Sequence, residues 1–263
     1  MIMALAPKKR FGQHFLTSPD IVQRIVDAAE IKSNEAVLEI GPGKGVLTGS
    51  LRDKAGHLYA VEVDRDLARA LRESYAGDQR ITIVENDFLD CELDSLIPGS
   101  FKVVANLPYY VAVPIIEYLL VYKQRIDAIV VMVQKEMAER MAAQPGNGDY
   151  GSLSVFIQYH ARVEKLFDVP PSAFVPPPKV TSSVIRLTPH PPPVAVADET
   201  AFFAFVRKLF GTRRKMLRTT LRNMFGATPA DLEKIAEIDL TRRPETLEMR
   251  ELALLYDRIG KHS

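Results

Sequence analysis

Short apolar runs alternate with amphipathic, helix-spaced segments from residue 36 to residue 133, and this alternation constrains the fold more than any other feature. The apolar runs cover residues 36–40, 58–63, 81–84, 101–105 and 128–133. Parallel strands need a long crossover, which is usually a helix. The alternation therefore predicts a parallel sheet with helices on both faces. Run 128–133 is the most apolar, as is typical of a strand covered on both faces.

The flanking segments carry further signals. Ser18-Pro19-Asp20 predicts the start of a leading helix after a basic tail at residues 1–17. Residues 155–159 and 184–187 are predicted to be strands that close the sheet as a hairpin-like pair. The Pro-rich segment 169–178 between them leaves no room for another long helix.

A proline run at residues 189–193 predicts a stiff, extended linker and therefore a domain boundary. We expect a first domain at residues 1–188, a linker at 189–197 and a second domain at 198–263. Apolar side chains in the last segment recur at helical spacing, which predicts a small helical bundle.

Charge and composition exclude several classes of protein. The 34 Lys and Arg nearly balance the 33 Asp and Glu, so a nucleic acid would have to meet a local basic patch. With only Cys91 and five scattered His, we expect no disulfide, no metal and a reducing compartment. Because no apolar run approaches the roughly 20 residues of a membrane helix and no signal core is present, we expect a cytoplasmic protein without a membrane partner.

The segment Glu39-Ile40-Gly41-Pro42-Gly43-Lys44-Gly45 stands where a predicted strand turns into a helix. Glycines at such a turn let the backbone approach a ligand, which is typical of a nucleotide-binding loop. A P-loop is excluded, because Lys44 is followed by Gly45 rather than by Ser or Thr. The glycines also lack the Gly-x-Gly-x-x-Gly spacing of dinucleotide sites, which disfavours NAD.

Two acids follow the next two predicted strands. Glu62 stands 21 positions after Gly41, where an acid can accept both hydroxyls of a ribose. Asp87 ends the third strand at the same carboxyl edge and could accept the amino group of an adenine. Either acid alone would be better explained as a helix cap or a solvated charge. A glycine loop and two acids at three successive strand ends favour ligand binding.

Asn106-Leu107-Pro108-Tyr109-Tyr110 follows the fourth strand at the same edge. The Asn106 side-chain oxygen and the Pro108 carbonyl could accept the two hydrogens of an exocyclic amine, while Tyr109 could stack on an extruded base. Without the preceding motifs, a simple turn would be the preferred explanation.

Two more segments, Gly12-Gln13-His14-Phe15-Leu16 and Phe174-x-Pro176-x-Pro178-x-Val180-x-Ser182, complete a pattern. Together with the Asn106 motif, they resemble the ribosomal RNA adenine N6-dimethyltransferase family, in particular its bacterial members that act on the small ribosomal subunit. The glycine loop is similar to motif I of S-adenosylmethionine-dependent methyltransferases, and the Asn106 motif to motif IV of the amino methyltransferases. The resemblance extends from Lys8 to about Leu255.

The resemblance implies a Rossmann-like class I S-adenosylmethionine-dependent methyltransferase fold, with a mostly parallel seven-stranded sheet and a small C-terminal all-helical domain. Residues 1–188 would be the catalytic domain and residues 198–263 the RNA-binding domain. The implied activity is dimethylation of the N6 amino groups of two adjacent adenosines in a hairpin loop near the 3′ end of small-subunit rRNA, within an immature subunit. S-adenosylmethionine would be the methyl donor without a metal, and we expect a monomer.

The resemblance also implies roles for individual residues. His14 and Leu16 would line the methionine end of the cofactor, and Gly41 and Gly43 would lie beneath it. Glu62 would bind the ribose, Asp87 the adenine, and Asn106 the junction of cofactor and substrate. The implied catalytic residues, with Phe174 as a second stacking face opposite Tyr109, are Asn106, Leu107, Pro108, Tyr109 and Phe174. Methyl transfer discharges a cation, so we expect alignment and electrostatics to dominate, with no catalytic His.

Residues 200–230 contain seven cations and no acid, which predicts a basic helical face for the RNA backbone, although charge runs are commonly mere solvated surface. The expected RNA contacts are Lys8, Lys9, Arg10, Arg207, Lys208, Arg213, Arg214, Lys215, Arg218 and Arg222.

Three other functions stay open from the sequence. A DNA adenine methyltransferase or a large-subunit rRNA dimethyltransferase would share the loop, the acids and the Asn106 motif. A non-catalytic assembly or nucleic-acid-binding factor could keep the same fold, although intact Glu62 and Asn106 speak against it. A dehydrogenase is weakened by the glycine spacing.

Overall fold

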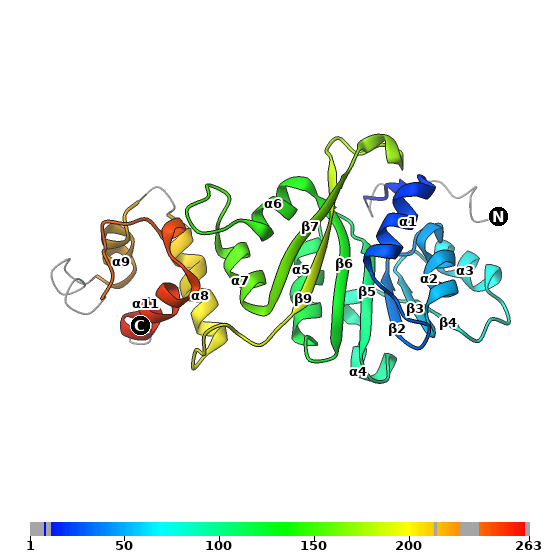
Figure 1. Cartoon of the computed structure of the whole chain (residues 1–263), viewed down its shortest axis with the longest axis horizontal. Helices are drawn as coiled ribbons and strands as arrows, with labels where there is room; N and C mark the ends of the chain where they lie inside the picture. Colours follow the sequence, from blue (N-terminus) through cyan, green and yellow to red (C-terminus); the bar gives the residue numbers. More distant parts are fainter. Residues whose placement is uncertain (1–7, 9–11, 213–214, 227–236, 261–263) are drawn as a thin grey trace. The chain divides into compact units, whose positions relative to one another are not determined.

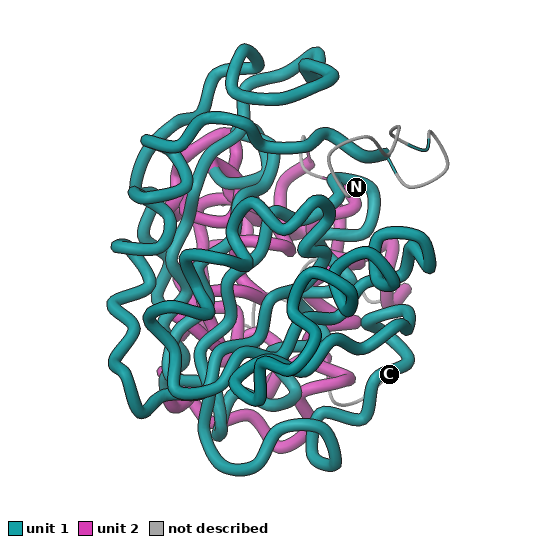
Figure 2. Tube along the Cα trace, turned by 90° about the vertical axis from the view of Figure 1, so that its right-hand side faces the viewer, with its two compact units in different colours: residues 1–138, 162–190 teal, residues 139–161, 191–263 magenta. Residues whose placement is uncertain are grey.

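The computed structural model describes residue 8 and residues 12–212, 215–226 and 237–260. Figure 1 shows the order of the elements along the chain. The chain divides into two compact units, drawn in different colours in Figure 2. Unit 1 comprises residues 1–138 and 162–190, and unit 2 comprises residues 139–161 and 191–263.

Unit 1 is built on a seven-stranded sheet in the order β4-β3-β2-β5-β6-β9-β7. Its strands are β2 (Ala36–Ile40), β3 (His57–Glu62), β4 (Ile81–Glu85), β5 (Phe101–Asn106), β6 (Ile126–Gln134), β7 (Ala161–Val169) and β9 (Ser182–Pro189). Strands β4, β3, β2, β5 and β6 run parallel, and β9 is antiparallel to β6. The predicted mostly parallel sheet is confirmed.

Helices connect the parallel strands, as the alternation predicts. They are α2 (Val46–Lys54), α3 (Arg65–Ser74), η3 (Phe88–Asp90, a 3₁₀ turn) with α4 (Leu93–Leu96), and α5 (Ala112–Val121). Helix α1 (Pro19–Ala28) precedes the first strand of this sheet, and the 3₁₀ turn η4 (Pro171–Ala173) follows β7. Helix α1 begins with a proline in its first turn and buries Ile21, Val22 and Ile25. These side chains pack with α2 and with Val104 and Val130 of the sheet in one apolar core.

A second, two-stranded sheet brings the N-terminal segment to the Pro-rich loop. Strand β1 (Phe15–Leu16) pairs antiparallel with β8 (Phe174–Val175), and Leu16 lies opposite Phe174. The backbone N–H of Thr17 extends this contact by donating to the Ala173 carbonyl at 2.8 Å. Two sequence motifs that are about 160 residues apart thus lie side by side.

The prediction of a strand at residues 155–159 is wrong, because this run lies in helix α7 (Ser152–His160). A short apolar run cannot be assigned by periodicity alone. Here the start of a helix is stabilised by the Gly151 N–H, which donates to the Ser154 hydroxyl at 3.0 Å. The second added strand is instead β7, which directly follows α7 and whose side chains do not alternate cleanly between buried and exposed.

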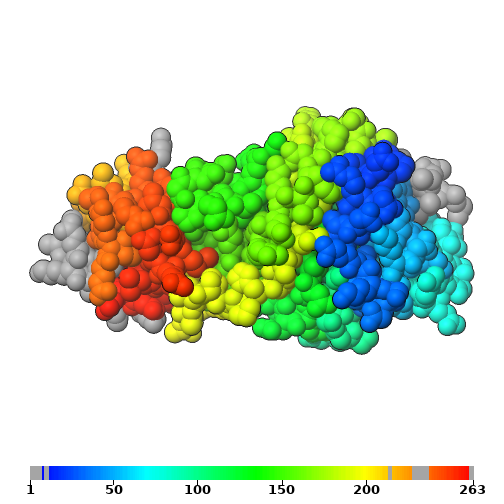
Figure 3. Space-filling view, viewed as in Figure 1, coloured from blue at the N-terminus to red at the C-terminus, as the bar shows by residue number. Residues whose placement is uncertain are grey.

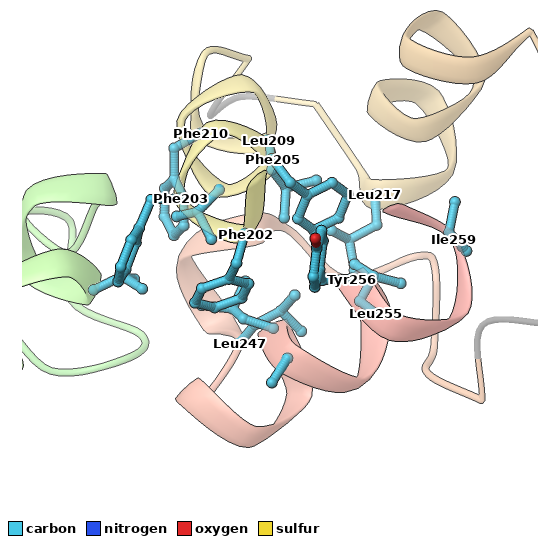
Figure 4. Close-up of a cluster of buried hydrophobic side chains, with 14 of the residues drawn as sticks. Phe202, Phe203, Phe205, Leu209, Phe210, Leu217, Leu247, Leu255, Tyr256 and Ile259 are labelled. Atoms are coloured by element: carbon cyan, nitrogen blue, oxygen red, sulfur yellow. The ribbon is translucent and has the colours of Figure 1, made fainter. Parts of the chain in front are cut away.

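Unit 2 is helical in the residues that the structure describes. Besides α7 it contains the end of α6 (Lys135–Ala142), α8 (Glu199–Phe210), α9 (Leu217–Phe225), the 3₁₀ turn η5 (Pro244–Thr246) and α11 (Met249–Arg258). Figure 4 shows its core, in which Phe202 and Phe205 of α8 lie against Tyr256 of α11. The apolar spacing that predicted a small bundle is the spacing of these buried side chains.

Residues 139–161, which the sequence analysis assigns to the first domain, lie in the second compact unit. This segment belongs to unit 2, because Tyr150 and Tyr159 pack with Phe210 and Phe203 respectively. The second boundary, after His190, falls within the expected linker; Figure 3 shows the surface of the chain coloured by residue number, with yellow near residue 200. In the described part of the chain, no helix is both long and apolar enough to cross a membrane.

Candidate functional site

A pocket opens at the carboxyl ends of β2, β3 and β5, where open α/β sheets bind their ligands. Four segments line it: residues 12–16 with β1, the glycine loop, the end of β3 and the Asn106 motif. The lining residues are Gly12, Gln13, His14, Phe15, Leu16, Glu39, Gly41, Pro42, Gly43, Lys44, Val46, Leu47, Glu62, Val63, Asn106, Leu107, Pro108, Tyr109 and Tyr110.

The glycine loop has a backbone that L side chains rarely adopt. Gly41, Gly43 and Gly45 have φ angles of +65°, +58° and +79°. A Cβ on Gly43 would stand 3.2 Å from the Phe15 ring, whereas a Cβ on Gly41 would meet nothing within 4 Å. The open side of Gly41 belongs to the pocket wall, so a ligand can approach this backbone closely, as the sequence predicts.

Glu62 is fixed between the loop and the start of α3. Its Oε2 accepts the Gly43 N–H at 2.9 Å, and its Oε1 accepts the Asp64 N–H at 2.9 Å. The side chain is 3% exposed, and burial raises its pKa although these backbone hydrogen bonds act in the opposite direction. Glu62 therefore determines the shape of the loop in addition to lining the pocket.

Glu39 is a pocket residue for which the loop motif alone predicts no separate role. Its side chain is 1% exposed, and its Oε2 has no hydrogen-bond partner in the described part of the chain. Burial, with the nearby Glu62 carboxylate, raises its pKa to about 8. An acid within the otherwise apolar run 36–40 was the signal that could have singled it out, because buried acids are rare.

The Asn106 motif lies where β5 ends. The Asn106 amide donates to the His14 carbonyl at 3.3 Å, which leaves its side-chain oxygen for another partner. The Pro108 carbonyl accepts the Val111 N–H at 3.1 Å, and its second lone pair stays available. The motif therefore keeps two acceptors at the pocket wall.

Tyr109 is held at both ends. Its hydroxyl is 2.7 Å from the Ser182 Oγ, and its ring is stacked on His14 with centroids 6.2 Å apart. Burial raises the pKa of its phenol, so the hydroxyl stays protonated. His14 is fixed in turn, because its Nδ1 is 2.7 Å from the Pro176 carbonyl oxygen. Leu16 completes this wall, and both residues line the pocket, while their contact with the methionine end of the cofactor stays a prediction.

Two of the expected site residues lie elsewhere. The Phe174 ring is 2% exposed in the apolar core beside Leu16 and does not line the pocket. Asp87 is exposed and caps the 3₁₀ turn η3, where its Oδ1 accepts the Leu89 N–H at 3.0 Å. The structure thus brings together the loop, Glu62 and Asn106, while the stacking role of Phe174 and the adenine contact of Asp87 stay predictions.

The expected RNA contacts also fall into separate groups. The Lys8 ammonium forms ion pairs with Asp64 at 2.6 Å and Asp66 at 2.7 Å. Of the expected contacts in unit 2, Arg207, Lys208, Lys215, Arg218 and Arg222 are exposed. Lys9, Arg10, Arg213 and Arg214 lie outside the described residues. Among the residues with described placement, no group of three or more His, Cys, Asp or Glu could hold a metal.

Comparison with known proteins relates this chain to RNA methyltransferases. The model of the ribosomal RNA adenine dimethylase family matches residues 5–261. A ribosomal RNA small subunit methyltransferase A from Alkaliphilus metalliredigens is 42% identical over 262 residues, covering 96% of this chain and 91% of the relative. The protein of the same name from Pseudomonas fluorescens is 41% identical over 256 residues, covering 96% and 94%.

Two solved structures share the fold over nearly the whole chain. A dimethyladenosine transferase from Plasmodium falciparum has a TM-score of 0.78 and 27% identity, and the alignment covers 94% of this chain and 98% of that one. The 23S rRNA methyltransferase ErmE has a TM-score of 0.71 and 27% identity, with coverage of 93% and 99%. The expected class I methyltransferase fold is confirmed.

Proposed function

This chain belongs to the ribosomal RNA adenine dimethylase family, as its motifs predict, and from that premise we propose that it dimethylates the N6 amino groups of two adjacent adenosines of small-subunit rRNA. The enzyme is an S-adenosylmethionine-dependent methyltransferase of class I. One observation supports the proposal above all others: the glycine loop, Glu62 and the Asn106 motif, which come from three separate strand ends, line a single pocket.

The pocket fits S-adenosylmethionine. The open side of Gly41 admits the cofactor to the backbone, and Val63 offers an apolar wall next to the ribose acid Glu62. The unpartnered Glu39 oxygen suits a cationic ligand, because a positive charge nearby favours the ionised carboxyl. When bound, S-adenosylmethionine supplies an activated methyl group on a sulfonium.

The residues of the Asn106 motif would prepare the target amine. The lone pair of an adenine amine is delocalised into the ring, which makes it a poor nucleophile. Hydrogen bonds from the amine to the Asn106 oxygen and the Pro108 carbonyl would orient that lone pair toward the methyl group. Tyr109, fixed by Ser182 and His14, would stack on the extruded base. Phe174 would have to leave the core to provide a second face.

Exposed cations of unit 2 would contact the RNA backbone, since no acid interrupts residues 200–230. Lys8 is better explained as a structural residue, because its ammonium already lies between two carboxylates. We further propose that the enzyme works as a cytoplasmic monomer, without a metal, on an immature small subunit.

Relatives that are 41–42% identical are named for the small subunit, whereas ErmE, at 27%, is named for 23S rRNA. This difference favours the small-subunit target over a large-subunit one. The test is transfer of labelled methyl groups to immature small subunits, naked rRNA, large-subunit rRNA and DNA, with the product nucleoside identified by mass. We expect dimethyladenosine from the small-subunit particle. Transfer to another nucleic acid would overturn the target, and cofactor binding without transfer would favour an assembly factor.

A further inference from the structure

Exposed apolar side chains gather around the mouth of the pocket. In the described part of unit 1, five large hydrophobic residues are classed as exposed: Val63, Tyr110, Val121, Val175 and Val180. Val63 and Tyr110 line the pocket directly, and Val175 lies opposite the pocket residue Phe15 in the β1–β8 pair. Val180 lies two residues before Ser182, which bonds to Tyr109. Single exposed apolar residues are normal, but here two line one pocket and a third pairs with a residue of its wall, which indicates a binding surface.

Tyr110 is the largest of these side chains and is 67% exposed. Its ring edge lies 3.6 Å from the position that a Cβ on Gly12 would take, so the ring rests against the N-terminal wall of the pocket. In the described part of the chain its hydroxyl has no hydrogen-bond partner. Its neighbour Tyr109 differs on each point, because it is half-buried and its hydroxyl is bonded to Ser182. Tyr110 therefore presents an unoccupied aromatic surface beside a fixed one.

We propose that Tyr110 stacks on a nucleotide base that flanks the pair of target adenosines. This inference rests on the proposed function, because it assigns a second base site to the same pocket. A base that leaves its stack exposes the face of its neighbour, and an aromatic ring next to the amine-binding motif can cover that face. Stacking between a base and an aromatic side chain contributes about 1–3 kcal/mol, which corresponds to roughly 5- to 150-fold in affinity.

The experiment combines protein variants with RNA variants in a double-mutant cycle. Tyr110→Ala removes the ring, and Tyr110→Phe keeps it without the hydroxyl. Val121→Ala is the matched control, because Val121 is 74% exposed but ends helix α5 and does not line the pocket. The substrates are the natural hairpin and two hairpins in which the base on the 5′ or the 3′ side of the adenosine pair is replaced by an abasic residue.

We expect Tyr110→Ala to lower kcat/KM on the natural hairpin at least about 5-fold, while Tyr110→Phe and Val121→Ala stay within about twofold. On one of the two abasic hairpins, kcat/KM of the wild type should fall by a similar factor. On that hairpin Tyr110→Ala should lower kcat/KM no further. The proposal would be overturned if Tyr110→Ala lowered kcat/KM by the same factor on all three hairpins, or on none of them. A parallel rise in the Kd for S-adenosylmethionine would instead assign Tyr110 to the cofactor wall. Failure of the wild type to methylate the natural hairpin would contradict the proposed function itself.

Discussion

Replacing Glu39 by glutamine tests the electrostatics of the pocket floor. Burial raises the pKa of this carboxyl from 4.5 to about 8. A carboxyl with a raised pKa in the folded protein takes up a proton on folding. Its contribution to stability is therefore complete below about pH 4.5 and is lost as the pH rises through about 8. Between these two pH values, the free energy of unfolding falls by about 1.4 kcal/mol for each pH unit.

A glutamine side chain cannot ionise, so the Glu39→Gln variant should escape this loss. Relative to the wild type, its free energy of unfolding should rise by about 3 kcal/mol between pH 4.5 and pH 7 and level off about 5 kcal/mol higher above pH 8. Any cost of packing the amide adds a constant offset and leaves this pH dependence unchanged. Urea unfolding without cofactor, followed by circular dichroism, measures the difference, because the chain has no Trp for fluorescence.

Glu117→Gln is the matched control, because Glu117 is exposed on α5 of the same unit. Its unfolding free energy should follow the wild type at every pH. Parallel profiles for Glu39→Gln and the wild type would refute the reasoning, since they would mean that Glu39 is ionised in the folded protein. The groups that face Glu39 are Glu62, Thr48 and Tyr75, and none of them carries a positive charge.

The same carboxyl links cofactor binding to protons. A cation bound in the pocket favours the ionised form of Glu39, so binding of S-adenosylmethionine near pH 7 should release up to about one proton. Calorimetric titrations in buffers of different ionisation enthalpy would measure this release. Glu39→Gln should abolish it, and S-adenosylhomocysteine, which lacks the sulfonium charge, should reduce it in the wild type.

Three further predictions follow from the site. Asn106→Ala should lower turnover at least about 100-fold while RNA affinity stays within about twofold; near-normal turnover would reject the amine-binding role. Lys208→Ala should weaken RNA binding and reduce the slope of log Kd against log salt by about 1. Lys32→Ala should change neither, because Lys32 is exposed in the loop that precedes the amino end of β2, away from the carboxyl ends that form the pocket. Lys8→Met should raise the Kd for S-adenosylmethionine up to about 5-fold and leave the slope of log Kd for RNA against log salt unchanged. A reduced slope would indicate that Lys8 contacts RNA.

The sheet and the loop could be predicted because their causes are local. Each parallel strand is an apolar run, and each crossover helix has its own periodicity, so the order of the elements is written along the chain. Gly41 and Gly43 follow from the backbone angles that the turn requires. The error at residues 155–159 arose where these local signals are ambiguous, and the Phe202 and Phe203 side chains that bury this helix lie about 45 residues away.

The pocket itself depends on long-range contacts that no local pattern contains. Asp87 follows its strand as Glu62 does, yet it caps a turn outside the pocket, because β4 is the edge strand and lies two strands away from the glycine loop of β2. Phe174 shares a motif with Ser182, yet only Ser182 reaches Tyr109, since Phe174 pairs with Leu16 and becomes core. Motifs thus identify which segments meet. The register of the β1–β8 pair places Phe174 in the core, so its stacking role requires a movement. Tyr110 lies in the turn after β5 and is exposed, so its stacking role requires none.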